Sequence, residues 1–251
     1  MIHTETPHSV TSHRRKRWVI PTSILGVAVV VIAGGLLWFF GGDPPPEVDL
    51  AATASSVAGD SELTATGIEG SWEVDTSVGE FTLEETTTAS FLGFRVDEVL
   101  NSIGSTTAVG RTPDVTGTIT VQGTTLSAAE ISGDLTAIVS DESRREDSIQ
   151  RSLNTSTNPS ATFVLTEPID LGSAATEGEV VSVAAIGDLT INGITNQVEV
   201  DLEAQLVDGL ILVTGSTDVV FADYGIAAPS SPAVLSVEDH GTVEIQLWLS
   251  R

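Results

Sequence analysis

The chain has 251 residues, enough for one sizeable domain with additional segments, and it contains no cysteine. Disulfides, thiolate catalysis and cysteine-ligated metal centres are therefore excluded. Of the 35 acidic residues only Glu5 precedes residue 43, so 34 acids and six arginines follow, and a surface that acidic repels nucleic acid.

The N-terminal region has the pattern of a membrane anchor. A basic cluster, HRRKR, closes residues 1–17, and residues 18–40 then run for 23 positions without a charge. A bilayer-spanning helix needs about 20 such residues. The positive charge before the run predicts a cytoplasmic tail (1–17), a single-pass anchor in the cell membrane (18–40), and an extracytoplasmic remainder. The alternative is a cleaved signal peptide, whose apolar core is usually about 7–15 residues long.

Residues 41–69 are rich in Gly, Pro, Ala, Ser and Thr and contain few large apolar residues. Such a composition does not bury enough apolar surface to form a core. We therefore expect a flexible tether here, followed by a folded domain over residues 70–251.

From Trp72 onward the apolar residues alternate with polar ones, and Gly, Asn and Asp separate the alternating segments. This pattern predicts an antiparallel sandwich or barrel. Three runs, 128–139, 180–191 and 209–221, exceed the usual strand length of about 5–6 residues, which favours a closed barrel of tilted strands. The polar stretch 141–153 breaks the alternation and predicts one short helix.

Motifs for catalysis and for metal binding are missing from this pattern. The segment GDSEL (59–63) resembles an esterase block, but it falls in the expected tether, and His240 is the only histidine after the anchor. The carboxylates at positions 141, 142, 146 and 147 lack the spacing of a calcium loop and are interpreted as a solvated helix face. We therefore expect no enzyme activity, no catalytic residue and no metal.

Several blocks, taken in order, resemble the YceI-like family. They are GSWEVDTSVGEF (70–81), the segment 91–131, SRRED with NPSATFVLTEPI (143–169), GDLTINGITNQVEVDLEAQL (187–206), FADYGI (221–226) and SVEDHGTVEIQLWL (236–249). GFRVDE and VGRTPDVTG are similar to an actinobacterial, membrane-anchored branch of that family. The resemblance covers residues 70–250.

The resemblance implies an all-β fold, an extended, lipocalin-like, eight-stranded antiparallel β-barrel whose interior holds a polyisoprenoid or an isoprenoid quinone. Dimers occur in the family, which leaves a homodimer open. The residues expected to contact the lipid are Phe91, Phe94, Ile119, Val121, Ile131, Leu135, Phe163, Val181, Val183, Ala185, Leu189, Ile191, Val198, Val200, Ile211, Val213, Val219 and Phe221.

The chain departs from the family pattern at Asn192, where His or Arg is common, and at Asn158, where an aromatic residue is common. The histidine of the first strand is also missing, so the headgroup of the lipid is left open. Small residues at expected inward positions predict unfilled volume: Gly133, Ala137, Val181, Val183, Ala185, Gly187, Val213 and Gly215. The alternative is a structural or interaction domain of the cell envelope, whose barrel is filled by its own side chains.

Overall fold

The computed structural model describes residues 44–57, 67–83, 85–101, 104–227 and 234–251. They belong to a unit that spans residues 43–251. The predicted cytoplasmic tail (1–17) and anchor (18–40) lie outside the described residues and stay predictions. Within the described ranges, no helix combines the length and the apolar character needed to cross a membrane.

Antiparallel strands make up most of this unit, as the alternation of apolar and polar residues predicts. The strands are β1 (Gly70–Asp75), β2 (Phe91–Leu100), β3 (Gly104–Thr112), β4 (Val115–Gln122), β5 (Thr125–Asp134), β6 (Val139–Ser140), β7 (Ser160–Leu165), β8 (Ile169–Asp170), β9 (Val181–Ile191), β10 (Ile194–Val207), β11 (Leu210–Val220), β12 (Val234–Val237) and β13 (His240–Ser250). The helices are α2 (Leu50–Val57), α3 (Ser143–Ser152) and the short 3₁₀ helices η1 (Leu135–Ala137), η2 (Ala174–Glu177) and η3 (Phe221–Tyr224).

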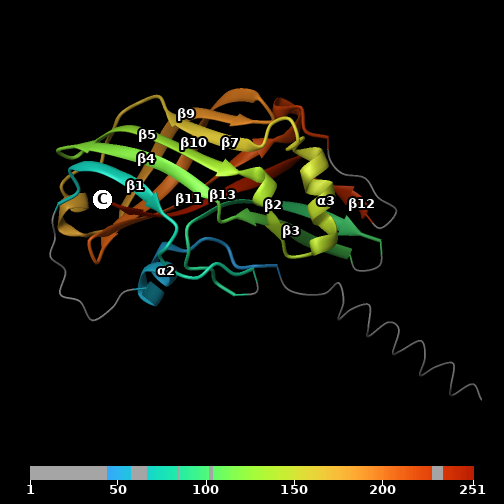
Figure 1. Ribbon diagram of the computed structural model, residues 1–251, viewed down its shortest axis with the longest axis horizontal. Helices are drawn as coiled ribbons and strands as arrows, with labels where there is room; N and C mark the ends of the chain where they lie inside the picture. Colours follow the sequence, from blue (N-terminus) through green and yellow to red (C-terminus); the bar gives the residue numbers. More distant parts are fainter. Residues whose placement is uncertain (1–43, 58–66, 84, 102–103, 228–233) are drawn as a thin grey trace, which may run out of the picture. The chain divides into compact units, whose positions relative to one another are not determined.

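Eight of the strands close into a barrel (Figure 1). Neighbours pair in the order β1-β4-β5-β7-β9-β10-β11-β13, and β13 returns to β1 through the register Glu73↔Ser250, Val74↔Leu249 and Asp75↔Trp248. Every pair in the ring is antiparallel. The prediction of an all-β, eight-stranded antiparallel barrel is confirmed, and α3 lies within the range predicted for a short helix.

Strand β13 pairs with β11 along one edge and with two different strands along its other edge. Its last residues pair with β1, whereas Thr242–Gln246 pair with β2, and β2 carries β3 and β12 beyond the ring. Strand β3 continues into β4 across Pro113 and Asp114, so one length of chain passes from this extension into the barrel. The extension therefore places β2 directly beside β13, with β3 one strand further away.

The run 128–139 is not one strand, contrary to the sequence prediction. Strand β5 ends at Asp134, whose carboxylate accepts hydrogen bonds from the Thr136 hydroxyl (2.6 Å) and the Thr136 backbone N–H (2.8 Å). These bonds cap the turn η1 and lower the pKa of the Asp134 carboxyl. Side-chain bonds of this kind compete with the β ladder, which alternation alone does not reveal. The other two long runs form β9 and β11 as predicted.

The segment expected to be a flexible tether (41–69) is in part folded. Helix α2 (blue in Figure 1) buries Leu50, which is 3% exposed, against Leu212 and Trp248. The buried hydroxyl of Thr53 donates to Gln246 Oε1 at 3.0 Å. The prediction of flexible chain is therefore wrong for residues 50–57, because the barrel supplies the apolar surface that the segment itself lacks. Residues 58–66 lie outside the described residues.

Candidate lipid-binding site

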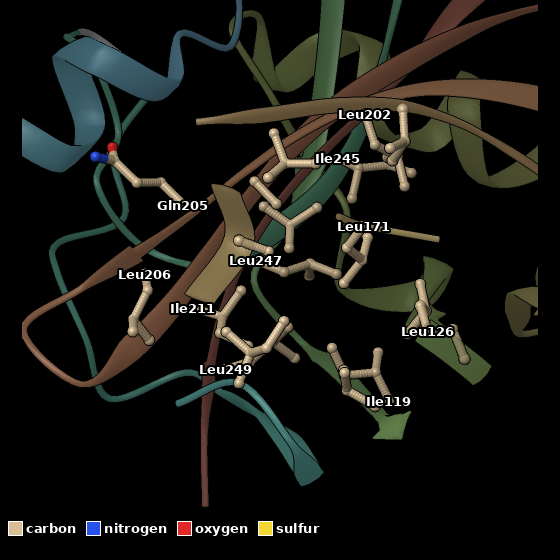
Figure 2. A pocket seen from close by; sticks show the side chains of 18 of the residues that line it. Ile119, Leu126, Leu171, Leu202, Gln205, Leu206, Ile211, Ile245, Leu247 and Leu249 are labelled. Carbon is tan, nitrogen blue, oxygen red and sulfur yellow. The ribbon is translucent and has the colours of Figure 1, made fainter. Parts of the chain in front are cut away.

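An apolar cavity of about 110 Å³ lies inside the barrel. Alternation along each strand turns one set of side chains inward, and that set supplies most of its wall. Figure 2 shows labelled side chains of β4, β5, β11 and β13 directed toward this space. The lining residues are Ile68, Ile119, Val121, Leu126, Ala129, Ile131, Phe163, Leu171, Ala175, Glu179, Val181, Val183, Val200, Leu202, Ala204, Gln205, Leu206, Ile211, Val213, Ile245, Leu247 and Leu249.

The volume of the cavity limits how much of a ligand it holds. An apolar cavity of roughly 150 Å³ admits a benzene molecule. The 110 Å³ found here is therefore suited to a few carbons, roughly one isoprene unit. A longer chain has to leave part of itself outside the cavity or displace side chains of its wall.

Only two polar side chains, Glu179 and Gln205, are among the residues that line the cavity. Glu179 is exposed to solvent. The Gln205 amide Nε2 donates to the carbonyl of Gly178 at 3.1 Å. This hydrogen bond holds the turn after η2. The remaining wall has no group that hydrogen-bonds to a ligand, so it selects by apolar contact and shape rather than by polar recognition.

The short segment before β1 contributes Ile68, which is 4% exposed, to the cavity wall. Its carbonyl accepts a hydrogen bond from the Trp72 indole at 2.8 Å. The Arg251 guanidinium donates to the carbonyls of Gly67 and Glu69, both at 2.8 Å, and lies 4.3 Å from the Trp72 ring centroid. Side chains from both ends of the domain thus hold Ile68 in place.

Half of the predicted lipid contacts come together at this cavity. Each belongs to the inward set of its strand, so the predicted alternation is correct at these positions of β4, β5, β7, β9, β10 and β11. The nine residues are Ile119, Val121, Ile131, Phe163, Val181, Val183, Val200, Ile211 and Val213.

Four other predicted residues, Leu189, Ile191, Val198 and Val219, also point into the barrel but belong to its other half. They pack around Tyr224, which is 2% exposed and whose burial raises the pKa of its phenol. This half of the interior is filled by protein. Its residues are therefore core residues in the structure and do not line the cavity.

The last five predicted residues lie elsewhere. Ala185 faces inward opposite Val200 but is only 1% exposed and is absent from the cavity wall. Leu135 belongs to η1. Phe91 lies under Arg111, whose guanidinium carbon is 4.4 Å from the ring centroid. The remaining two rings lie against strand glycines, Phe94 against Gly110 and Phe221 against Gly241.

The prediction that small inward residues leave empty volume is wrong at several glycines. A Cβ on Gly187 would overlap the ring of Phe163, and one on Gly215 would overlap Leu202. Leu92 lies over Gly133 in the same way. A large side chain from another strand covers each bare backbone position, so these glycines make room for protein atoms instead of for a ligand.

Thirteen of the lining residues were not predicted from the sequence, and they fall into three groups. Leu202, Ala204, Leu206, Ile245, Leu247 and Leu249 share the alternation of their strands, so the signal was present. Leu126 and Ala129 are three residues apart because a register shift interrupts the β4–β5 pairing, and Gln205 adjoins an inward residue near a strand end. Ile68, Leu171, Ala175 and Glu179 come from segments between strands, where periodicity gives no signal.

The outer face of the same wall is covered as well. Leu212 and Trp248, both 0% exposed, alternate with the lining residues Ile211 and Leu249 and pack against Leu50 of α2. The Trp248 indole donates to the carbonyl of Thr88 at 2.7 Å. The cavity wall formed by β11 and β13 is therefore supported from outside the barrel.

A buried charge network fixes the segment before α2 to this outer face. Glu244, 2% exposed, accepts from Arg95 Nε at 2.6 Å and from Arg111 at 3.0 Å. Arg111 also donates to the carbonyl of Pro46 at 2.6 Å, and Arg95 donates to that of Pro45. Burial lowers the pKa of Arg111, and the charge of Glu244 opposes that change. Each arginine thus joins β13 to a proline of the N-terminal segment.

Comparison with known families identifies one match. The sequence model of the YceI-like domain matches residues 72–249, which is most of the chain. The resemblance to the YceI-like family found in the sequence is thereby confirmed. Comparison with curated protein sequences finds no match.

Comparison with solved structures finds similar chains at low sequence identity. A polyisoprenoid binding domain from Saccharophagus degradans, implicated in plant cell wall breakdown, is 18% identical, with a TM-score of 0.53 over 73% of this chain and 99% of that one. BcnA from Burkholderia cenocepacia is 15% identical, with a TM-score of 0.49 over 63% of this chain and 95% of that one. The YceI protein of Campylobacter jejuni is 16% identical, with a TM-score of 0.45 over 55% and 82%.

Proposed function

Because the chain belongs to the YceI-like domain family, we propose that it binds the apolar chain of an isoprenoid-type lipid inside its barrel, without catalysis. The observation that carries the proposal is the cavity, whose wall is aliphatic and aromatic apart from Glu179 and Gln205. The Saccharophagus degradans domain, which shares the fold, is described as polyisoprenoid binding. A polyisoprenoid or an isoprenoid quinone fits such a wall.

Burial of hydrocarbon is sufficient to drive this binding. Each buried CH₂ contributes about 0.8 kcal/mol, so one isoprene unit of five carbons contributes roughly 4 kcal/mol before the entropy of binding is subtracted. The chain end enters the cavity, and the rest of the lipid extends past Glu179 and Gln205. The headgroup then stays outside the apolar wall, which explains how the site functions without a polar subsite.

The same proposal places the barrel outside the cytoplasm, attached to the cell membrane through residues 18–40. The support is the basic cluster before that uncharged run. Since Pro45 and Pro46 are bound to Arg95 and Arg111, only residues 41–44 separate the run from the folded unit. In this proposal the membrane supplies the lipid, and the barrel carries or sequesters it, alone or as a homodimer.

The proposal is tested by extracting the full chain, purified from membranes, with organic solvent and analysing the extract by mass spectrometry. We expect an isoprenoid-type lipid in an amount equimolar with the protein. Folded protein that yields no lipid, and that takes up none when farnesol is added, would contradict the proposal.

The packed half of the barrel favours a second candidate, a structural or interaction domain of the cell envelope. Leu189, Ile191, Val219 and Tyr224 fill that half as an ordinary protein core does. In this case the cavity is a packing defect that has no ligand, and the extraction yields no stoichiometric lipid. The same experiment therefore separates the two functions.

A further inference from the structure

One side chain, Phe163 of β7, lies at the boundary between the cavity and the packed half of the barrel. It lines the cavity, and it also packs against the cluster of Leu189, Ile191 and Tyr224. Its position in the sheet is fixed by pairing with Ile131 on one side and Leu189 on the other. Its ring therefore forms the end of the open space along the barrel.

A glycine in the adjacent strand β9 allows the Phe163 ring to occupy this position. The ring lies across Gly187 of β9, where a Cβ would overlap ring atoms Cζ and Cε2. Gly187 belongs to the inward set of β9 together with Ala185 and Leu189, and a Cβ there would also overlap the backbone carbonyl of Val164, so any other residue would displace the ring. The pair of Phe163 and Gly187 thus sets where the cavity stops.

We propose that Phe163 determines how far an apolar chain enters the barrel and so which chain lengths gain affinity. This inference rests on the proposed lipid binding and adds a specificity-determining residue to it. Isoprene units that enter the cavity up to the ring are buried. Units beyond that depth remain outside and add no apolar contact with the wall.

The test measures the affinity of the full chain for prenol, geraniol and farnesol, which lengthen by one isoprene unit at each step. Because the cavity holds roughly one isoprene unit, wild-type affinity rises up to about that length and then levels off. In Phe163→Ala the rise continues for at least one further unit, because the cavity extends toward the packed half. Each additional buried CH₂ is worth roughly fourfold in affinity, so we expect at least about a tenfold gain for the first alcohol beyond the wild-type limit.

The matched control is Phe94→Ala. The ring of Phe94 also lies over a strand glycine, Gly110, but it does not line the cavity. Its truncation removes the same atoms and leaves the length dependence unchanged. If Phe163→Ala does not fold, Phe163→Leu replaces it, and a smaller shift in the same direction is expected.

The outcomes separate this inference from the proposed function. Wild-type protein that binds the alcohols, with the same length dependence in the Phe163 variants, overturns the role of Phe163 and leaves lipid binding intact. An equal shift in Phe94→Ala also overturns it, because the effect would then be one of general loosening. Folded wild-type protein that binds none of the alcohols overturns both.

Discussion

The two halves of the barrel interior differ in what occupies them, although their strands have the same alternation. In one half, Ile119, Val183 and Leu247 border an open cavity. In the other, Leu189 and Ile191 of β9 pack against Tyr224 in a buried cluster. Alternation therefore determines which face of a strand points inward, but not whether the inside is filled.

The filling and the support come from segments outside the alternating pattern. The packed half receives Tyr224 from η3 and Leu153, the residue that follows α3. The open half receives Leu50 of α2, but on the outside, behind Leu212 and Trp248. One half is thus stabilised by its contents. The other is supported from outside by residues 45–57, which include α2 and which we call the brace.

The largest effect is expected where the brace of the open half is released. Glu244→Gln leaves the buried guanidinium groups of Arg95 and Arg111 without their counter-charge, and we expect a loss of about 3–5 kcal/mol in the free energy of unfolding. Urea denaturation of the full chain measures it. The matched control, Glu199→Gln, alters an exposed glutamate of β10 and should change stability by less than about 0.5 kcal/mol. Equal effects in the two variants would show that the brace contributes nothing.

Truncating one leucine in each half compares the two interiors directly. Leu189→Ala removes a side chain that is 6% exposed and packed on all sides, so a loss of about 2–5 kcal/mol is expected. Leu202→Ala removes one that already borders open space, so fewer contacts are lost and the cost is smaller. Thermal unfolding monitored by far-UV circular dichroism measures both. A larger loss in Leu202→Ala would reverse the assignment of the two halves.

Enlarging two inward residues of β9 tests the same difference with the opposite change in side-chain volume. Ala185, 1% exposed, has no adjoining space, so Ala185→Trp overpacks the interior and costs about 1–3 kcal/mol or more. Val183 lines the cavity, and Val183→Trp places its ring in open volume at a lower cost. The melting temperature of the ligand-free protein should fall further for Ala185→Trp. Equal falls would indicate that the cavity closes in solution.

The smallest effect is expected on the outer face of the same strands. Asp201 of β10 is exposed and lies between the inward residues Val200 and Leu202. Asp201→Ala should change the free energy of unfolding by no more than about 0.5 kcal/mol and leave lipid content unchanged. Loss of lipid in this variant, with Val183→Trp unaffected, would mean that the inside and the outside of β10 are exchanged.

Much of this organisation follows from the sequence, and the part that does not has identifiable causes. Alternation and turn residues predict the barrel and the inward set of β9, including Val181 and Val183. They do not predict the brace, because residues 50–57 depend on contacts with Trp248 and Gln246, which are far away in the chain. Nor do they predict Ile68 as a wall residue, since its place depends on hydrogen bonds from Trp72 and Arg251 to the carbonyls of residues 67–69.

The amount of lipid that stays with the wild-type chain and with Val183→Trp, both purified from membranes and shown to be folded, tests the central claim most directly. If the cavity of the open half holds an isoprenoid chain, the wild type carries an equimolar amount of lipid and Val183→Trp carries at least about tenfold less, a difference of roughly 1.4 kcal/mol or more in binding. Equal amounts of lipid on the two proteins, or none on the wild type, would contradict the claim.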